Sequence, residues 1–254
     1  MDALRVLLSL TMLGYTSWVD LKTREIYDMV WLVFGGLGLI IALYEVYTGS
    51  LALVWFVAVV LISSAISIGL GYLGLFGGAD VLAFIALTVL HPTPPRGLEP
   101  FLGIVSPLFP LTLFSNSALS GASYSLVLLV RNLASTLQGR NLFSGLEDES
   151  TWRKLVVMFT GIKMEVGSVR GPPFQYPLEV PGTEEMPGRR LILMPDIQDD
   201  DSAVEVFKTL EDSGVEEVWV SNTLPFLVYI AIGYVLALAL GDIALATLKP
   251  FFLG

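Results

Sequence analysis

The chain has 254 residues, a mean hydropathy of +0.71 and only 15% charged residues. This composition excludes an ordinary soluble globular protein, and its long apolar runs are typical of a protein that lies in a bilayer. The chain has no cysteine and a single histidine, His91, which excludes disulfides, cysteine nucleophiles and multi-histidine metal sites. Any catalysis must therefore use carboxylates, hydroxyls or amines.

The formal net charge is −10, and most of it lies in one polar segment, residues 138–221. This segment has 16 acidic and 8 basic side chains, which is a charge of −8. The simplest interpretation is a solvated surface, and the functional alternative is attraction of a basic substrate segment. Nucleic acid is not an expected partner of such an acidic segment.

Apolar runs predict about six transmembrane helices. Proline recurs through residues 91–110, which argues against a straight helix, so we expect residues 101–114 to form an ordered loop or a re-entrant piece. The predicted spans are residues 4–19, 29–47, 51–70, 81–90, 119–137 and 225–248.

The polar segment is predicted to be a small α+β domain inserted before the last helix. Apolar, β-branched runs predict buried strands at 154–159 and 191–194, and a capped helix is expected at 203–212. Alternating acidic and apolar residues at 215–220 predict an edge strand. The chain is thus expected to be an α-helical polytopic membrane protein with three parts: helices and loops at 1–137, the acidic domain at 138–221 and the last helix at 222–254.

Lys and Arg in short loops predict the orientation in the membrane. Lys22 and Arg24 follow the first span, and the polar segment begins with Arg140. The best fit places the first loop, the glycine-rich stretch 74–80 and the polar segment in the cytoplasm. In this topology two acids, Asp20 and Asp80, lie at the same depth, at cytoplasmic helix ends.

A peptide bond can be hydrolysed by two carboxylic acids that share one proton, which requires two acids at matching depth on facing helices. An ionised carboxylate takes a proton from water while a neutral one donates a proton to the carbonyl oxygen. Gly74, Gly77 and Gly78 precede Asp80, and residues without a Cβ allow an extended substrate to approach closely. Alternatively, these glycines form a packing turn between helices.

Two other polar residues, Asp242 and His91, lie in or beside apolar runs. Asp242 lies about 25 Å beyond Pro225 along the last predicted helix, which separates it from Asp80 and favours an outer-interface or buried polar role. His91 is expected to be an interfacial or capping residue.

Residues 20–28 and 77–80 resemble the membrane-embedded GxGD aspartic peptidases, specifically type IV prepilin and archaeal preflagellin peptidases. The first segment resembles the Asp-x-x-x-Arg-x-Ile pattern that follows the first helix of that family. The second segment, Gly77-Gly78-Ala79-Asp80, stands in the place of Gly-x-Gly-Asp, with Ala79 replacing the second glycine. The resemblance covers residues 1 to about 95 well and the remainder loosely.

The resemblance implies an aspartic endopeptidase in an archaeal cell membrane. Asp20 and Asp80 would be the catalytic pair, and a precursor with a short basic leader and a hydrophobic helix would be cut at the cytoplasmic face. Lys22 and Arg24 would support the site or set topology, while Glu25 and Asp28 would read a basic leader residue. No metal or cofactor is implied. Because the cysteine-rich N-terminal domain of many bacterial prepilin peptidases has no counterpart here, only peptidase activity is expected.

Two other functions fit parts of the sequence. A proton- or cation-coupled transporter would use Asp20, Asp80 and Asp242 as binding groups, but it predicts repeats around a midplane acid, and the sequence contains no evident repeat. A non-catalytic scaffold whose acidic domain docks partners leaves the matched acids unexplained.

Overall fold

The computed structural model describes residues 1–97, 99–182, 188–197 and 199–253. The chain forms two compact units: Met1–Gly121 with Pro225–Gly254, and Ala122–Leu224. The first unit is helical, and the second is a small mixed unit. Helix α5 (Phe109–Leu137) contributes residues to both units.

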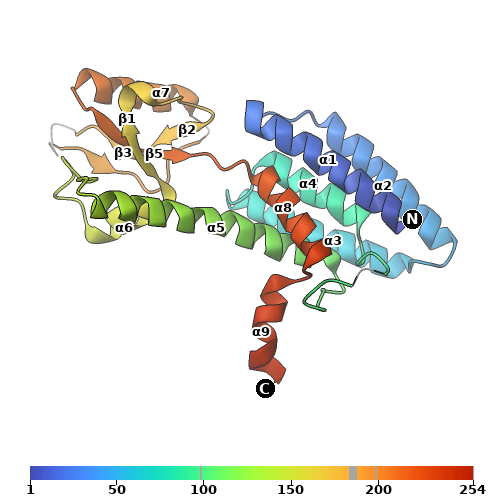
Figure 1. Ribbon diagram of the computed structural model, residues 1–254. Coiled ribbons are helices and arrows are strands. Elements are labelled where there is room, and N and C mark those ends of the chain that lie inside the picture. The colour runs from blue at the N-terminus through green and yellow to red at the C-terminus, as the bar shows by residue number, and fades with distance from the viewer. Residues whose placement is uncertain (98, 183–187, 198, 254) are drawn as a thin grey trace. The chain divides into compact units, whose positions relative to one another are not determined.

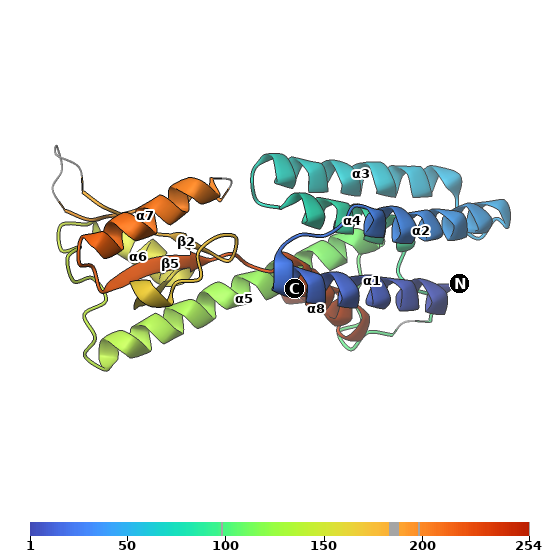
Figure 2. The same ribbon diagram turned by 90° about the horizontal axis from the view of Figure 1, so that it is seen from above.

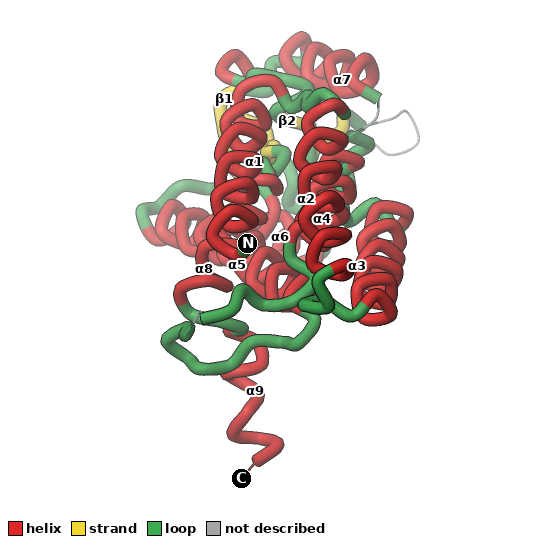
Figure 3. Tube along the Cα trace, turned by 90° about the vertical axis from the view of Figure 1, so that its right-hand side faces the viewer, coloured by secondary structure: helices red, strands yellow, loops and turns green. Residues whose placement is uncertain are grey.

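Helix α4 is the central element of the first unit. It packs against α2 on one side and α3 on the other, while α1 packs against α8. Figures 2 and 3 show α4 between α3 and α1. The bounds are α1 Asp2–Thr23, α2 Met29–Tyr47, α3 Leu53–Tyr72, α4 Gly78–Leu90, α8 Phe226–Ala239 and α9 Ile243–Leu253.

Three described helices, α2, α3 and α5, are long and apolar enough to cross a membrane. A fourth span is possible if the bent pair α8 and α9 is counted as one. Helix α4 is apolar but short, and α1 does not meet the same test. The structure therefore supports a polytopic membrane protein, and it does not confirm six spans.

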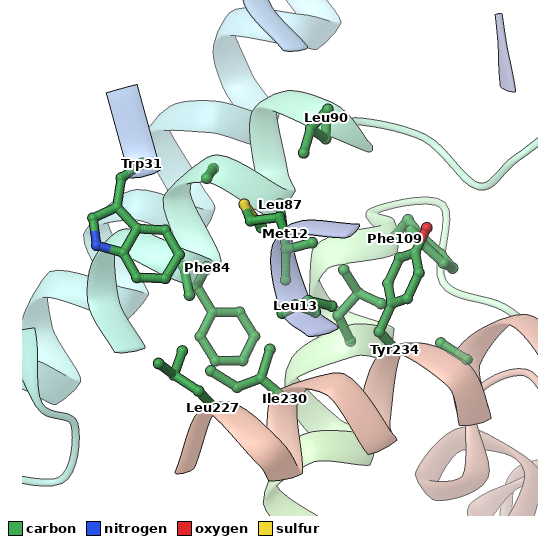
Figure 4. Packing of buried hydrophobic residues seen from close by; sticks show 14 residues of the cluster. Met12, Leu13, Trp31, Phe84, Leu87, Leu90, Phe109, Leu227, Ile230 and Tyr234 are labelled. Atoms are coloured by element: carbon green, nitrogen blue, oxygen red, sulfur yellow. The ribbon is translucent and has the colours of Figure 1, made fainter. Parts of the chain in front are cut away.

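The core of the helical unit lies where α1, α4, α5 and α8 meet. Met12 and Leu13 of α1 pack against Leu87 of α4 and Ile230 of α8, all with 1% exposure or less. Figure 4 shows these side chains converging from separate helices. This packing fixes the position of α1 relative to α4, and so of the acids that those helices carry.

Buried polar contacts join α1 to the C-terminal end of α4. The Arg5 guanidinium of α1 donates to the backbone carbonyl of Leu90 and pairs with Glu45 of α2 at 2.6 Å. His91, the C-cap of α4, contacts Ser9 Oγ at 3.0 Å and Tyr234 OH at 2.8 Å through Nε2. Of the two expected roles, interfacial or capping, the structure shows the second: His91 is the buried C-cap residue of α4.

The last apolar run is not one straight helix. Helices α8 and α9 meet at an angle of 57°, and Gly241 at the break has a φ of +91°. A Cβ on Gly241 would stand 2.3 Å from the carbonyl oxygen of Ile104, so only glycine fits there. The run expected at 225–248 is therefore two helices broken at Gly241 rather than one continuous helix. Residues 101–114, expected to form an ordered loop or a re-entrant piece, are only partly a loop, because α5 already begins at Phe109.

The second unit contains the C-terminal part of α5, the helices α6 and α7, a short 3-10 helix and short strands (Figure 1). Both expected buried strands differ: of residues 191–194 only Leu191 lies in a strand, and residues 154–159 lie in a helix. Ser150 caps this helix by accepting from the Arg153 N–H, and its apolar residues recur at helical spacing. The bounds are α6 Thr151–Thr160, β1 Ile162–Glu165, the short 3-10 helix η1 Val166–Ser168, β2 Gln175–Pro177, β3 Glu179–Val180, β4 Arg190–Leu191, α7 Asp200–Asp212 and β5 Glu217–Asn222.

Strand β5 is the centre of the sheet, not its edge. The strand order is β1-β5-β2, with antiparallel pairs such as Ile162 opposite Val220, and β3 pairs separately with β4. Trp219 packs into one apolar cluster with Val157 of α6, while Val218 and Val220 pack into another with Leu210 of α7. Successive side chains of β5 point to opposite faces of the sheet, and both faces are covered by apolar residues.

Candidate active site

Asp20 lies in the last turn of α1 and is 9% exposed. Arg24 follows as the C-cap with a φ of 62°, the left-handed conformation that turns the chain away from the helix. Its Nη1 lies 3.5 Å from Asp20 Oδ1. The carboxyl group of Asp20 also accepts a backbone hydrogen bond from Leu227, in the first turn of α8. The end of α1, its cap and the start of α8 together hold this carboxylate.

Asp80 lies in the first turn of α4, after the glycine-rich break. Its Oδ2 accepts a hydrogen bond from the Gly77 N–H at 2.9 Å, which is one half of a capping box. A carboxylate is favoured at this position by the unpaired N–H groups of the first turn. The side chain is only partly buried. The local sequence therefore explains why an acid is tolerated at the head of an apolar helix.

The structure brings Asp20 and Asp80 together. Although 60 residues separate them, Asp80 lies within direct electrostatic reach of both Asp20 and Arg24. The last turn of α1 and the first turn of α4 thus carry two acids whose charges influence each other.

Phe76 is a supporting residue that the sequence analysis missed. Its ring stacks on Phe84 of α4 with centroids 5.3 Å apart, and it contacts Phe226 of α8 at 5.1 Å and Phe114 of α5 at 6.0 Å. This cluster anchors the glycine-rich loop directly before Gly77. An aromatic residue inside a glycine-rich break was the signal that could have revealed it.

Among the described residues, three predicted supporting residues, Lys22, Glu25 and Asp28, make no hydrogen bond or ion pair with Asp20 or Asp80. Lys22 is exposed and lies over the Trp18 ring at 4.2 Å, and Glu25 is exposed in the loop. Asp28 is the exposed N-cap residue of α2, without a side-chain capping bond.

The two residues before Asp80, which begin α4, differ in their packing. Ala79, in the place of the second motif glycine, packs its methyl group against the main apolar core. Gly78 is exposed, and a Cβ there would meet nothing within 4 Å.

Asp242 does not join this site. It is 2% exposed and accepts hydrogen bonds from Thr112 Oγ1 at 2.8 Å and the Leu245 N–H at 2.9 Å. The expectation of a buried polar contact is confirmed, and its carboxylate caps α9 at the break after α8. Among the described residues, no group of three or more His, Cys, Asp or Glu side chains is arranged to hold a metal ion.

Comparison with known proteins decides the family. A model described as the Type IV leader peptidase family matches residues 7–126, which include both acids of the pair. A second model, described as the Archaeal Peptidase A24 C-terminus Type II, matches residues 153–243. The chain belongs to the type IV leader peptidase family. Membership identifies it as a protease, and its apolar helices fit a membrane protein.

Three relatives are similar to this chain along nearly its whole length. The preflagellin peptidase of Methanococcus maripaludis is 25% identical over 91% of this chain and 93% of its own length. That of Methanocaldococcus jannaschii is 26% identical over 89% of each chain. That of Methanococcus voltae is 23% identical over 91% of this chain and 92% of its own.

Proposed function

We propose that this chain is a membrane aspartic endopeptidase that removes the leader peptide from preflagellin- or prepilin-like precursors. The observation that carries the proposal is the approach of Asp20 and Asp80 from the ends of α1 and α4 in a chain of the leader peptidase family. The names of the three relatives support preflagellin as the substrate class.

The chemistry follows from two carboxyl groups that share one proton. The ionised carboxylate takes a proton from a water molecule, and the oxygen of that water attacks the carbonyl carbon of the scissile bond. The neutral carboxylic acid donates its proton to the carbonyl oxygen. Because the two groups interact, the shared proton belongs to the pair, and the two roles are not assigned to single residues.

Collapse of the tetrahedral intermediate completes the reaction. The carbon–nitrogen bond breaks, and the leaving amine receives the proton that the first carboxylate took from water. The gem-diol proton returns to the other carboxylate, which restores the starting state of one proton on the pair. Each proton transfer of this kind contributes about 10²–10⁴-fold to the rate.

Residues around the pair support the binding of a basic leader. Glu25 and Asp28 leave two exposed carboxylates in the loop after α1, and these would attract a Lys or Arg upstream of the cut. Arg24 positions the Asp20 carboxylate, and Gly77 with Gly78 leaves the α4 entrance open to an extended chain. We place this end of the helices, and the cut, at the cytoplasmic face of an archaeal cell membrane, because Lys22 and Arg24 favour that side.

The test uses the purified protein in detergent with a precursor that carries a basic leader and an apolar helix. Asp20→Asn and Asp80→Asn are each expected to abolish cleavage while the melting temperature stays close to that of the wild type. Asp148→Asn, at an exposed acid of the second unit, is the matched control and should cleave normally. Full cleavage by either site variant would remove that residue from the mechanism.

A further inference from the structure

An open groove of about 610 Å³ lies between α2 and α4, on the outside of the helical unit. Its walls are apolar and include Trp31, Leu32 and Leu39 of α2 and Leu82, Ile85 and Val89 of α4. From Asp28 to Leu39 the α2 wall is roughly 16 Å long at 1.5 Å per residue. The groove therefore has the length of about three turns of an α-helix.

One end of this groove adjoins the proposed catalytic pair. Helices α2 and α4 both begin at this end, where Leu82 stands two residues after Asp80. Asp28, whose carboxylate makes no capping bond to α2, also lines the groove at this end. A chain that lay in the groove and continued past Leu82 would reach Asp80 and would pass a free-standing negative charge on the way.

Glycines set the shape of the groove. At Gly38 a Cβ would meet the Leu90 side chain at 3.0 Å, so glycine there allows α2 to pack closely on α4. At Gly36, which lines the groove, a Cβ would meet nothing within 4 Å. The space in front of Gly36 is thus open, and internal packing does not account for a glycine at this position.

A buried donor also lacks a partner in this wall. Trp31 is 6% exposed, and its indole N–H has no hydrogen-bond partner among the described residues. Figure 4 shows the Trp31 ring reaching from α2 toward α4. A buried, unpaired N–H is costly, and a peptide carbonyl or a hydroxyl would satisfy it. A lipid acyl chain offers no acceptor.

We propose that the α2–α4 groove binds the apolar helix of the precursor, with its leader end toward Asp28 and the catalytic pair. The inference rests on the proposed function and adds the surface that positions the substrate. Charge complementarity sets the direction, because the basic leader then lies at the acidic end and the apolar helix along the apolar walls.

The test fills the groove without changing the catalytic end. Gly36→Leu places a bulky side chain in the open space, and Gly14→Leu, at an exposed position of α1 where a Cβ also meets nothing within 4 Å, is the matched control. Each variant is assayed on two substrates: the full precursor, and a truncated precursor that has the leader and the cleavage site but no apolar helix. We expect Gly36→Leu to lower kcat/KM on the full precursor by about tenfold or more and to leave the truncated substrate within about twofold.

Other outcomes separate the two proposals. Equal rates of Gly36→Leu and Gly14→Leu on the full precursor, as expected if the groove holds only lipid, would overturn the groove assignment. Equal losses on both substrates would overturn it too. If the unmodified protein cut neither substrate, the proposed function itself would fail.

A second measurement does not depend on the folding of a filled variant. A photo-crosslinking amino acid replaces Leu39, an exposed groove residue, in the full-length protein with Asp80→Asn. Crosslinks to the apolar helix of the bound precursor are expected. Crosslinks to lipid alone, in the presence of precursor that is bound, would contradict the proposal.

Discussion

Arg24 Nη1 lies 3.5 Å from Asp20 Oδ1, and Arg24 makes this contact from a left-handed backbone conformation with a φ of 62°. Among the described residues it is the only one other than glycine with a positive φ. Glycine would adopt this conformation at about 1 kcal/mol lower cost. The residue at this position therefore combines an unfavourable backbone with a contact to the candidate site.

Replacing Arg24 separates stability from activity. In Arg24→Gly, relief of the backbone opposes loss of the ion pair, so the free energy of unfolding should change by less than about 1 kcal/mol. Cleavage should fall by about tenfold, because the Asp20 carboxylate then loses its guanidinium partner. Arg24→Lys should restore part of the rate, and the pH profile of Arg24→Gly should differ from that of the wild type. An unchanged rate and profile would limit Arg24 to capping α1.

The shared proton predicts a bell-shaped dependence of kcat/KM on pH. At low pH both Asp20 and Asp80 are protonated, and no base is present to activate water. At high pH both are ionised, and no acid is present to protonate the carbonyl oxygen. The measurement is the initial cleavage rate of a precursor at subsaturating concentration across pH. Activity that rises monotonically with pH would point to a single base.

Two adjacent glycines should respond differently to the same substitution. A Cβ at Gly77 would stand 3.2 Å from Asp80 Oδ2, and a Cβ at Gly78 would meet nothing within 4 Å. Gly77→Ala should therefore displace the Asp80 carboxylate and lower kcat by about tenfold, while Gly78→Ala should leave kcat close to that of the wild type and raise KM, because its methyl group occupies the space open to the substrate. Equal losses of kcat in both variants would contradict a specific effect of Gly77 on the Asp80 carboxylate.

The ring of Phe76 is expected to stabilise the glycine-rich stretch before Asp80. Phe76→Ala removes contacts with three rings and is expected to lower the free energy of unfolding by about 2 kcal/mol and to impair cleavage. The matched control is Phe101→Ala, because Phe101 is 85% exposed. Thermal melting of both variants in detergent tests the difference, and a loss no larger than that of the control would contradict the anchoring role.

The second unit depends on a buried acid. Glu179 is fully buried and pairs with Lys163 at 2.5 Å and Arg189 at 2.8 Å, and it also accepts the Trp219 N–H. Removing its charge leaves a buried lysine unpaired, at a cost of about 3–5 kcal/mol.

The comparison for Glu179→Gln is Glu217→Gln. Glu217 pairs with Arg140 at a more exposed position, where an ion pair contributes about 0–1 kcal/mol. Denaturant unfolding is expected to show a larger loss of unfolding free energy for Glu179→Gln than for Glu217→Gln. Equal effects would mean that the pairs of Glu179 are replaced by water or by other groups.

Much of the helical arrangement was predictable because bilayer helices leave long apolar runs. The second span was predicted at 29–47, where α2 lies, and the two acids were placed at helix ends. Local breaks were harder to predict. Gly241 and Asp242 bend the last run because Gly241 meets the Ile104 carbonyl and Asp242 finds donors on α5, and neither partner is visible in the local sequence.

The polar segment was predicted less well for a similar reason. Residues 154–159 are β-branched and apolar enough to suggest a strand, but the Ser150 cap and the burial of Val157 on one face favour a helix. Residues 215–220 suggested an edge strand because acidic and apolar residues alternate there, whereas the pairing of β5 with both β1 and β2 depends on distant chain segments. For the site, sequence patterns could find the acids but not the aromatic contacts of Phe76.

The central claim is that Asp20 and Asp80 act as one catalytic unit, and a double-mutant cycle tests it most directly. Cleavage is measured for Asp20→Asn, Asp80→Asn and the double variant under single-turnover conditions. Because a shared proton requires both carboxyl groups, each single variant should lose at least about 10²–10⁴-fold, and the double variant should lose no more than either single one. Losses that multiply in the double variant, or a single variant that cleaves at the wild-type rate, would contradict the account.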